Sequence, residues 1–346
     1  MDAPTLDSRL VGAFQRDFPL EPAPYAAIGR ALGVSESSVL EALARLVADG
    51  VVSRVGGVFR AGSLGASTLV AIAVPPTSLA AVAERVGRWP GVNHSYEREH
   101  RFNLWLVVHA ADRAALAALV ARLKRETGCE TLALPLEREF HIDLGFDLGV
   151  DHGVDRRADP GARTRAHRAP APSRLPTPAP LDARERAIAA ALQPGLPLVS
   201  RPYASLARRA GLPAAGGEDD VLAQLSRWLD DGTLRRLGVI VRHRALGYEA
   251  NAMAVWDVPD DELDAAGRRL ACEAAVNLAY ARARARPAWP YNLYCVVHGR
   301  VRAEVDAELD AIGARCRLDR YPHLRLFSRT AFKQCGARTF EAVVDG

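Results

Sequence analysis

The sequence has almost no lysine, no closely paired cysteines and no long apolar run, and each absence excludes a class of protein. Its five cysteines are odd in number and never form a C-x-x-C pair, which argues against a disulfide framework and against a zinc or iron–sulfur site. No segment approaches the roughly 20 apolar residues of a membrane-spanning helix, and the first residues lack the features of a signal peptide. We therefore expect a cytoplasmic protein that needs no membrane.

The cations are almost all arginine, because lysine occurs only at Lys124 and Lys333. High-GC codon usage alone would produce this bias. A functional alternative is that planar guanidinium groups bind carboxylates and phosphates through two parallel hydrogen bonds, which suits a polyanionic ligand. The net charge of +4 is modest and does not choose between the two explanations.

The chain of 346 residues, 49% of them hydrophobic, is long enough for several domains and carries an internal duplication. Each half begins with two short helices joined by a glycine-containing turn and a wing, and continues as strand, helix, strand, strand, helix, strand. These patterns predict a winged helix-turn-helix and a ferredoxin-like, split βαβ domain. Matching strings support the duplication: Val92-Asn93-His94-Ser95-Tyr96 with Val276-Asn277-Leu278-Ala279-Tyr280, Asn103-Leu104-Trp105 with Asn292-Leu293-Tyr294, and Val107-Val108-His109 with Val296-Val297-His298.

We therefore predict an α+β protein, a tandem duplication of a winged helix-turn-helix followed by a ferredoxin-like domain. The winged helices are expected at 1–62 and 181–246, the ferredoxin-like domains at 63–149 and 247–346, and a Pro- and Arg-rich linker at 150–180. The linker is expected to be a solvated tether, with anion binding by its arginines as the alternative. Strands are expected at 67–74, 92–98, 103–109, 131–139, 250–258, 275–280, 292–298 and 318–329.

The second helix of each helix-turn-helix is poorly suited to DNA. In the first half Arg45 is its only cation, and in the second half the equivalent place, 213–220, contains proline, glycines and three acids. Contacts with phosphates supply most of the affinity for DNA, and the negative charges of this acidic segment would repel those phosphates. We expect these helices to support the wing as a scaffold.

The organisation and several strings resemble known families. A winged helix followed by this ferredoxin-like domain resembles the Lrp/AsnC regulators. A narrower resemblance, to the siroheme decarboxylases and most of all to their fused D–L form from the pathway to heme d1 in denitrifying bacteria, covers both halves except the linker. It rests on these strings: Arg236-Leu237-Gly238-Val239, Arg242-His243, Leu246-Gly247, Ala250-Asn251-Ala252-Met253-Ala254-Val255-Trp256, Trp289-Pro290-Tyr291-Asn292-Leu293-Tyr294, His298-Gly299, Val92-Asn93-His94-Ser95-Tyr96 and Phe140-His141-Ile142-Asp143-Leu144-Gly145-Phe146.

The resemblance implies that the protein removes carbon dioxide from two acetate side chains of siroheme to give didecarboxysiroheme. The carbanion left behind is delocalised by the conjugated macrocycle and must then be protonated. No organic cofactor or protein metal site is expected, since the siroheme iron belongs to the substrate. Siroheme is thus the expected partner. Binding to a second decarboxylase complex of the same pathway, and association with further copies of this chain, remain open.

Two histidines differ between the halves. His94 in the first half aligns with Leu278 in the second, and His243 in the second aligns with Ala61 in the first. Because histidine donates protons near neutral pH, with a typical gain of roughly 10²–10⁴-fold, we predict that His94 and His243 are the proton donors. They would share one pocket or serve one acetate each, and a structural histidine is the alternative for either. Either of them, or His141, could also bind the siroheme iron.

The arginines are expected to have another task. A guanidinium on the reacting carboxylate would stabilise the ground state more than the transition state, in which that charge is leaving. We therefore predict that a set of arginines holds the carboxylates that survive: Arg235, Arg236, Arg242, Arg244, Arg282, Arg284 and Arg286. Trp289, Tyr291 and Asn292 are expected to line the macrocycle, with core packing as the alternative for Trp289.

Two other functions remain open at this point. One is a transcription regulator of the Lrp/AsnC type whose ferredoxin-like domains sense a small ligand. The other is a tetrapyrrole-binding protein without catalysis. Salt-dependent binding to DNA would favour the first, and siroheme that is bound and recovered unchanged would favour the second.

Overall fold

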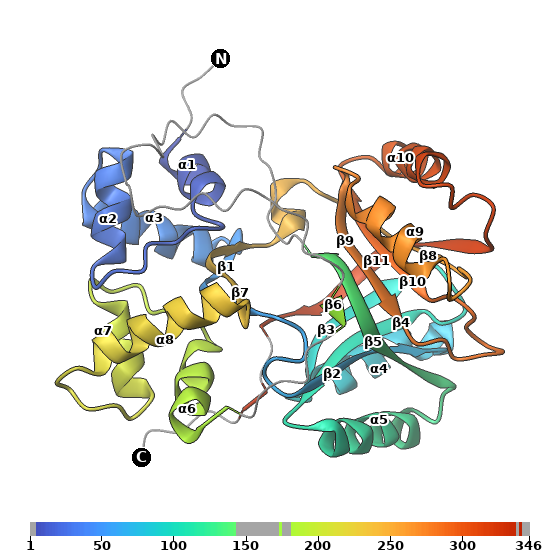
Figure 1. The fold of residues 1–346 in the computed structure, drawn as a ribbon, viewed down its shortest axis with the longest axis horizontal. Helices are drawn as coiled ribbons and strands as arrows, with labels where there is room; N and C mark the ends of the chain where they lie inside the picture. The colour runs from blue at the N-terminus through green and yellow to red at the C-terminus, as the bar shows by residue number, and fades with distance from the viewer. Residues whose placement is uncertain (1–4, 143–172, 175–180, 337–338, 341–346) are drawn as a thin grey trace.

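The computed structural model describes residues 5–142, 173–174, 181–336 and 339–340. Two helical units lie on one side of the molecule, and a β-barrel with helices on its outer surface lies on the other (Figure 1). The predicted linker, 150–180, lies outside the described residues except for β6 (Ser173–Arg174), which pairs with β5 (Thr131–Ile142). Within the described ranges, no helix has both the length and the apolar character that a membrane crossing requires.

The helical units of the two halves share one hydrophobic core. The hydroxyl of Tyr25 donates to the carbonyl of Pro197 at 3.2 Å, and that of Tyr203 donates to the carbonyl of Pro19 at 2.8 Å. These reciprocal bonds make the units a pseudo-dimer. The helices of the first half are α1 (Leu6–Ala13), α2 (Pro24–Leu32) and α3 (Glu36–Ala48), and those of the second are α6 (Ala183–Leu192), α7 (Pro202–Arg209) and α8 (Gly217–Asp231).

The predicted wings differ from the structure. Each described helical unit contributes one strand, β1 (Val52–Phe59) or β7 (Leu234–Val241), and the two strands pair antiparallel with each other, Gly56 opposite Gly238. A Cβ atom on Gly238 would lie 2.2 Å from the carbonyl oxygen of Gln15, so only glycine fits there. The sequence pattern identified the strands but carried no information on their partners.

The acidic segment of the second half is also more ordered than predicted, because α8 begins at Gly217. Its first turn carries Glu218, Asp219 and Asp220, and carboxylates are stabilised at the positive end of a helix dipole. Glu218 pairs with Arg201, and Asp220 pairs with Arg184 at 2.7 Å. These acids therefore have a structural explanation as the first turn of the helix.

The two ferredoxin-like domains have the predicted element order, and this confirms the α+β duplication. The first contains β2 (Ala66–Ile72), η1 (Pro76–Ser78), α4 (Leu79–Gly87), β3 (Val92–Arg98), β4 (Leu104–Ala110), α5 (Arg113–Thr127) and β5. The second follows η2 (His243–Leu246) and contains β8 (Ala250–Trp256), α9 (Leu263–Ala271), β9 (Val276–Arg282), β10 (Leu293–Gly299), α10 (Arg302–Arg315) and β11 (His323–Gln334).

The two sheets join into one, in the order β2-β4-β3-β11-β8-β10-β9-β5-β6, and β2 also pairs with β5, so the sheet closes into a barrel. The long last strand of each domain makes the closure. The first part of β5 pairs with β2 and its second part with β9, while β11 pairs first with β8 and then with β3. Apolar side chains from both domains fill the interior, and α4, α5, α9 and α10 cover the outside.

A repeated asparagine fixes the start of the third strand in each domain. The side-chain amide of Asn103 bonds the backbone N–H and C=O of Val74 at 3.0 and 2.8 Å. Asn292, which is buried, bonds the same two groups of Val258 at 2.9 and 3.0 Å. The shared Asn-Leu-aromatic string is therefore a structural clamp. All of the bonding capacity of Asn292 seen here is directed to the backbone, and its predicted contact with the macrocycle stays a prediction.

Candidate active site

The candidate site lies where the barrel meets β7 and η2. Because side chains alternate along a strand, His94, Tyr96 and Arg98 of β3 share one face. The seven residues that gather here come from both halves of the chain. We call this group the barrel mouth: His94, Tyr96, Arg98, Glu139, Arg235, Arg244 and Tyr280.

His94 and Tyr96 form the aromatic part of the mouth. Their rings are stacked, with centroids 6.2 Å apart and planes 12° apart. Burial raises the pKa of Tyr96, and the nearby guanidinium groups of Arg98 and Arg244 oppose that rise. The phenol is therefore protonated at neutral pH and lies between a half-buried imidazole and two cations. The structure thus places predicted His94 and Arg244 around one residue.

Arg98 is buried beneath this pair and closes the barrel. Its Nη1 donates to the carbonyl of Leu326 at 2.8 Å, and burial lowers its pKa to about 10. Arg282, its counterpart in the second half, donates in the same way to the carbonyl of Leu134 at 2.9 Å, and its guanidinium lies 4.7 Å from the ring centre of Tyr280. Each arginine thus bonds the last strand of the other domain. Arg282, predicted to clamp a ligand, belongs to this closure.

Glu139 and Arg235 form an ion pair between β5 and β7. Glu139 is 3% exposed, and the Arg235 side chain is 18% exposed. Burial lowers the pKa of Arg235 to about 10, and the charge of Arg60 adds to this lowering. In the ladder between β5 and β9, Glu139 lies opposite Tyr280. Predicted Arg235 therefore belongs to the mouth.

Glu139 was not among the residues predicted from the sequence. A glutamate in a strand with alternating polarity is expected to face solvent, as the exposed Glu137 does. A β-bulge between Leu136 and Arg138 shifts the register and turns Glu139 inward. Sequence periodicity offers no signal for a bulge that is not marked by glycine.

The other residues of the predicted arginine cluster lie around β7 and η2. Nη1 of Arg236 donates to the carbonyl of Gln15 at 3.0 Å, and Nη2 of Arg244 donates to that of Arg329 at 3.0 Å. The side chain of Arg242 is exposed. His243 begins η2 next to Arg244, and its side chain lies outside the described part of the chain. Its predicted role as a proton donor stays a prediction.

The predicted arginines in the loop between β9 and β10 have carboxylates of this chain as partners. Arg284 bonds Asp257 at 3.0 Å, also pairs with Asp260, and donates to the carbonyl of Pro290 at 2.8 Å. Arg286 bonds Asp257 at 3.2 Å. In this structure these guanidinium groups therefore hold the loop, and their role as ligand clamps stays a prediction.

Trp289 is fully buried in the barrel, which favours the core-packing alternative over its predicted contact with the macrocycle. Its Nε1 donates to the hydroxyl of Tyr294 at 2.7 Å, and its ring centre lies 5.2 Å from that of Trp105. Tyr291 packs edge-on against it at 5.0 Å, and burial raises the pKa of Tyr291. The predicted contact of Tyr291 with a ligand stays a prediction.

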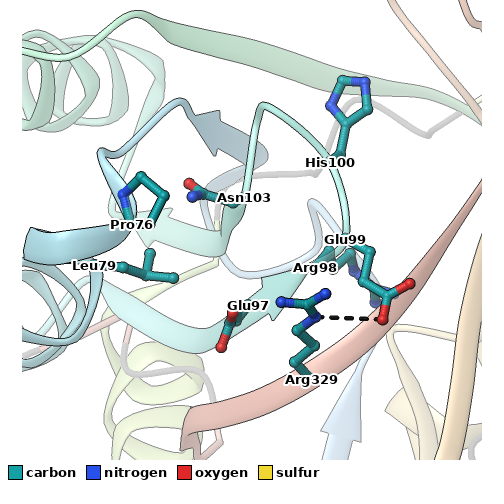
Figure 2. Close-up of a pocket in the computed structure, with 8 residues that line it drawn as sticks. All are labelled: Pro76, Leu79, Glu97, Arg98, Glu99, His100, Asn103 and Arg329. Atoms are coloured by element: carbon teal, nitrogen blue, oxygen red, sulfur yellow. Dashed lines mark hydrogen bonds and ion pairs between the residues drawn. The ribbon is translucent and has the colours of Figure 1, made fainter.

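A pocket of about 330 Å³, which shares Arg98 with the mouth, lies beside the loop that joins β3 to β4 (Figure 2). Within it, Glu99 accepts hydrogen bonds from Arg302 at 2.8 Å and from Arg329 at 3.3 Å, which lower the pKa of Glu99 to about 2. Two carboxylates, Glu97 and Glu99, line this pocket, against the single carboxylate of Glu139 at the mouth, so the pocket suits a polyanion less well. Its lining residues are Pro76, Leu79, Glu97, Arg98, Glu99, His100, Asn103 and Arg329.

Among the described residues, no metal-binding group or disulfide contributes a further feature to the site. No group of three or more His, Cys, Asp or Glu side chains there could hold a metal ion. The five cysteines are free thiols.

Two family models match the chain. The model of an AsnC-like ligand binding domain matches residues 63–141 and 245–333. The model of a siroheme decarboxylase NirDL-like HTH domain matches residues 7–52 and 185–235. The matched ranges follow the duplication, one of each model per half.

Curated relatives and solved structures agree with the family models. A siroheme decarboxylase NirDL subunit of Paracoccus denitrificans is 42% identical over 339 residues, covering 97% of this chain and 98% of the relative. A half-length relative, the siroheme decarboxylase NirD subunit of Pseudomonas aeruginosa, is 48% identical over 141 residues, 41% of this chain and 94% of the relative. A crystal structure of the siroheme decarboxylase NirDL in co-complex with an iron-uroporphyrin III analogue has a TM-score of 0.66 and 27% identity, covering 96% of this chain and 94% of that chain. From its domains, its duplication and these matches, the chain belongs to the siroheme decarboxylase family.

Proposed function

We propose that the protein is a siroheme decarboxylase that removes carbon dioxide from two acetate side chains of siroheme and gives didecarboxysiroheme, without an organic cofactor. The observation that carries this proposal is the barrel mouth, where a half-buried histidine and a tyrosine lie among arginines from both halves of the chain. A polyanionic macrocycle that must lose carboxylates and gain protons needs these groups. The near-full-length similarity to siroheme decarboxylases supports the same substrate.

The arginines of the mouth bind the carboxylates that the reaction leaves in place. Arg235 and Arg244 lie on β7 and η2, across from Tyr96 and Glu139 of the barrel. A guanidinium in a poorly solvated place binds a carboxylate through charge-assisted hydrogen bonds. These contacts orient the macrocycle, and the reacting acetate is directed away from the cations so that its charge is not stabilised before it leaves.

When the bond between the acetate carbon and its carboxylate breaks, carbon dioxide leaves, and the electron pair of that bond stays on the carbon and is delocalised into the macrocycle. A proton must then reach this carbon. His94 is the donor in the first half, and the stacked phenol of Tyr96 holds its ring in place. His243 is the predicted second donor. A positioned acid of this kind contributes roughly 10²–10⁴-fold, and the apolar barrel interior keeps water from the reacting carboxylate.

Anaerobic incubation of the pure protein with siroheme, followed by mass spectrometry, tests the proposal. Loss of two carbon dioxide units is the expected result and means that the single chain is sufficient. Loss of one would mean that a partner, such as a second decarboxylase complex, is needed for the other acetate. An unchanged mass with a shifted absorption band would contradict catalysis and identify a tetrapyrrole-binding protein.

A further inference from the structure

The ion pair of Arg235 and Glu139 has a third member, Arg60. The backbone N–H of Arg60 donates to the carbonyl of Thr233 at 2.9 Å, so Arg60 lies beside the start of β7. Its charge is close enough to lower the pKa of Arg235. Two cations thus lie near one another here, and one of them, Arg235, pairs with Glu139, which is 3% exposed. Such a group favours the approach of another anion.

The carboxylate of Glu139 is only half satisfied. Its Oε1 accepts from Arg235, whereas Oε2 is buried and has no hydrogen-bond partner among the residues that the structure describes. A buried acceptor without a partner costs about 1–3 kcal/mol, more when it is charged. Buried ion pairs are in any case weak contributors to stability. The pair is therefore a poor device for holding β5 to β7.

The second half of the molecule shows that the fold does not need this pair. Tyr96 lies opposite Ala331 in the barrel, as Tyr280 lies opposite Glu139, so Ala331 is the counterpart of Glu139. The pairing of Gly56 with Gly238 makes Ser53 the counterpart of Arg235. The same barrel closes against the same kind of strand there without either charge.

We infer that Arg60 and Arg235 form a carboxylate subsite, which Glu139 occupies as an internal carboxylate until a carboxylate of an anionic macrocycle displaces it. Glu139 thus competes with the ligand for Arg235 and sets how tightly the subsite binds. The identity of the ligand as siroheme rests on the proposed function, whereas the competition itself does not.

Absorbance titration with iron-uroporphyrin III, at fixed ionic strength, tests the competition. Glu139→Gln removes the competing charge and is expected to lower Kd about tenfold, while Arg235→Ala and Arg60→Ala each raise it about tenfold. In the Arg235→Ala background, Glu139→Gln is expected to change nothing further. Glu137→Gln, an exposed position on the same strand, is the matched control and is expected to leave Kd unchanged.

Thermal unfolding first establishes that each variant is folded. If Glu139→Gln is not, Glu139→Ala copies the residue that the second half carries at Ala331 and answers the same question. Weaker binding by a folded Glu139 variant, or tighter binding that persists without Arg235, would overturn the inference. Siroheme turnover by the unaltered protein is measured separately. If the unaltered protein turns over siroheme but the changes in Kd are the reverse of those expected, only the subsite is overturned. If the changes in Kd are as expected but there is no turnover, only the proposed function is overturned.

Discussion

The two halves of the molecule make the same contacts at some positions and different contacts at others. The positions that recur hold the structure together, since each residue makes the same bond in both halves: Tyr25 and Tyr203, Asn103 and Asn292, Arg98 and Arg282. The positions that differ gather at the barrel mouth: His94 and Leu278, Glu139 and Ala331, Arg235 and Ser53. Duplication thus supplies the scaffold, and the loss of symmetry indicates the site.

Moving the histidine between halves tests this comparison most severely. His94→Leu copies the second half and is expected to lower turnover roughly 100-fold, because it removes a proton donor. Leu278→His, added to this variant, is expected not to restore turnover, because Tyr280 beside it lies opposite the charged Glu139, whereas Tyr96 beside His94 lies opposite Ala331. Steady-state rates with siroheme measure both effects. Recovery of the rate in the double variant would mean that the halves are interchangeable.

Removing the repeated asparagines tests the scaffold instead. Asn292→Ala is expected to lower the free energy of unfolding by about 3 kcal/mol, because it leaves two buried backbone groups of Val258 without partners. Asn103→Ala is expected to cost about 1–2 kcal/mol, since its bonds to Val74 are only partly buried. Denaturant unfolding measures both. A stable Asn292→Ala protein with weakened siroheme binding would return Asn292 to the ligand site.

The scaffold was predictable from the sequence to a large extent, because its sequence pattern occurs in both halves of the chain. The strand Val92–Arg98 was predicted with its observed bounds, since Asn93 and Tyr96 recur as Asn277 and Tyr280. Closure of the barrel was not predicted, because alternation of polarity identifies the buried face of a strand and not its neighbour.

The site was predictable only in part. Comparison of the halves predicted His94, and the arginine-rich string predicted Arg235; both lie at the mouth. The sequence could not distinguish Arg284 from Arg235, because the carboxylates that hold Arg284 come from a distant turn at 257–260. Nor could it find Glu139, whose inward direction depends on a bulge.

The two halves also differ in the surroundings of an equivalent pair of histidines, His109 and His298, and this difference predicts a dependence of stability on pH. His298 bonds Asn251 at 2.6 Å and Asn277 at 2.9 Å, whereas burial lowers the pKa of its counterpart His109 to about 4. Below pH 6.5 His109 is protonated in the unfolded chain, whereas in the native protein it stays neutral until the pH approaches 4. The unfolding free energy should therefore fall by about 2–3 kcal/mol between pH 6.5 and pH 4.

His109→Gln is expected to flatten this part of the stability curve, measured by denaturant unfolding at a series of pH values. His298→Gln serves as the comparison, since it removes the hydrogen-bonded member of the pair. An unchanged slope in His109→Gln would mean that another group is responsible.

The smallest effect is expected for Arg284→Ala. Because Asp257 and Asp260 already bind its guanidinium, its removal should leave the Kd for siroheme within about twofold, against about tenfold for Arg235→Ala. Absorbance titration compares the two variants directly. A large loss of affinity in Arg284→Ala would restore the loop between β9 and β10 to the ligand site.

The central claim is that residues present in only one half carry out the decarboxylation. The most direct measurement is the mass of the product formed from siroheme under anaerobic conditions by the unaltered protein, by His94→Ala and by His243→Ala. We predict loss of two carbon dioxide units with the unaltered protein, and slow or incomplete loss with each variant. Full conversion by both variants at the unaltered rate would contradict the claim.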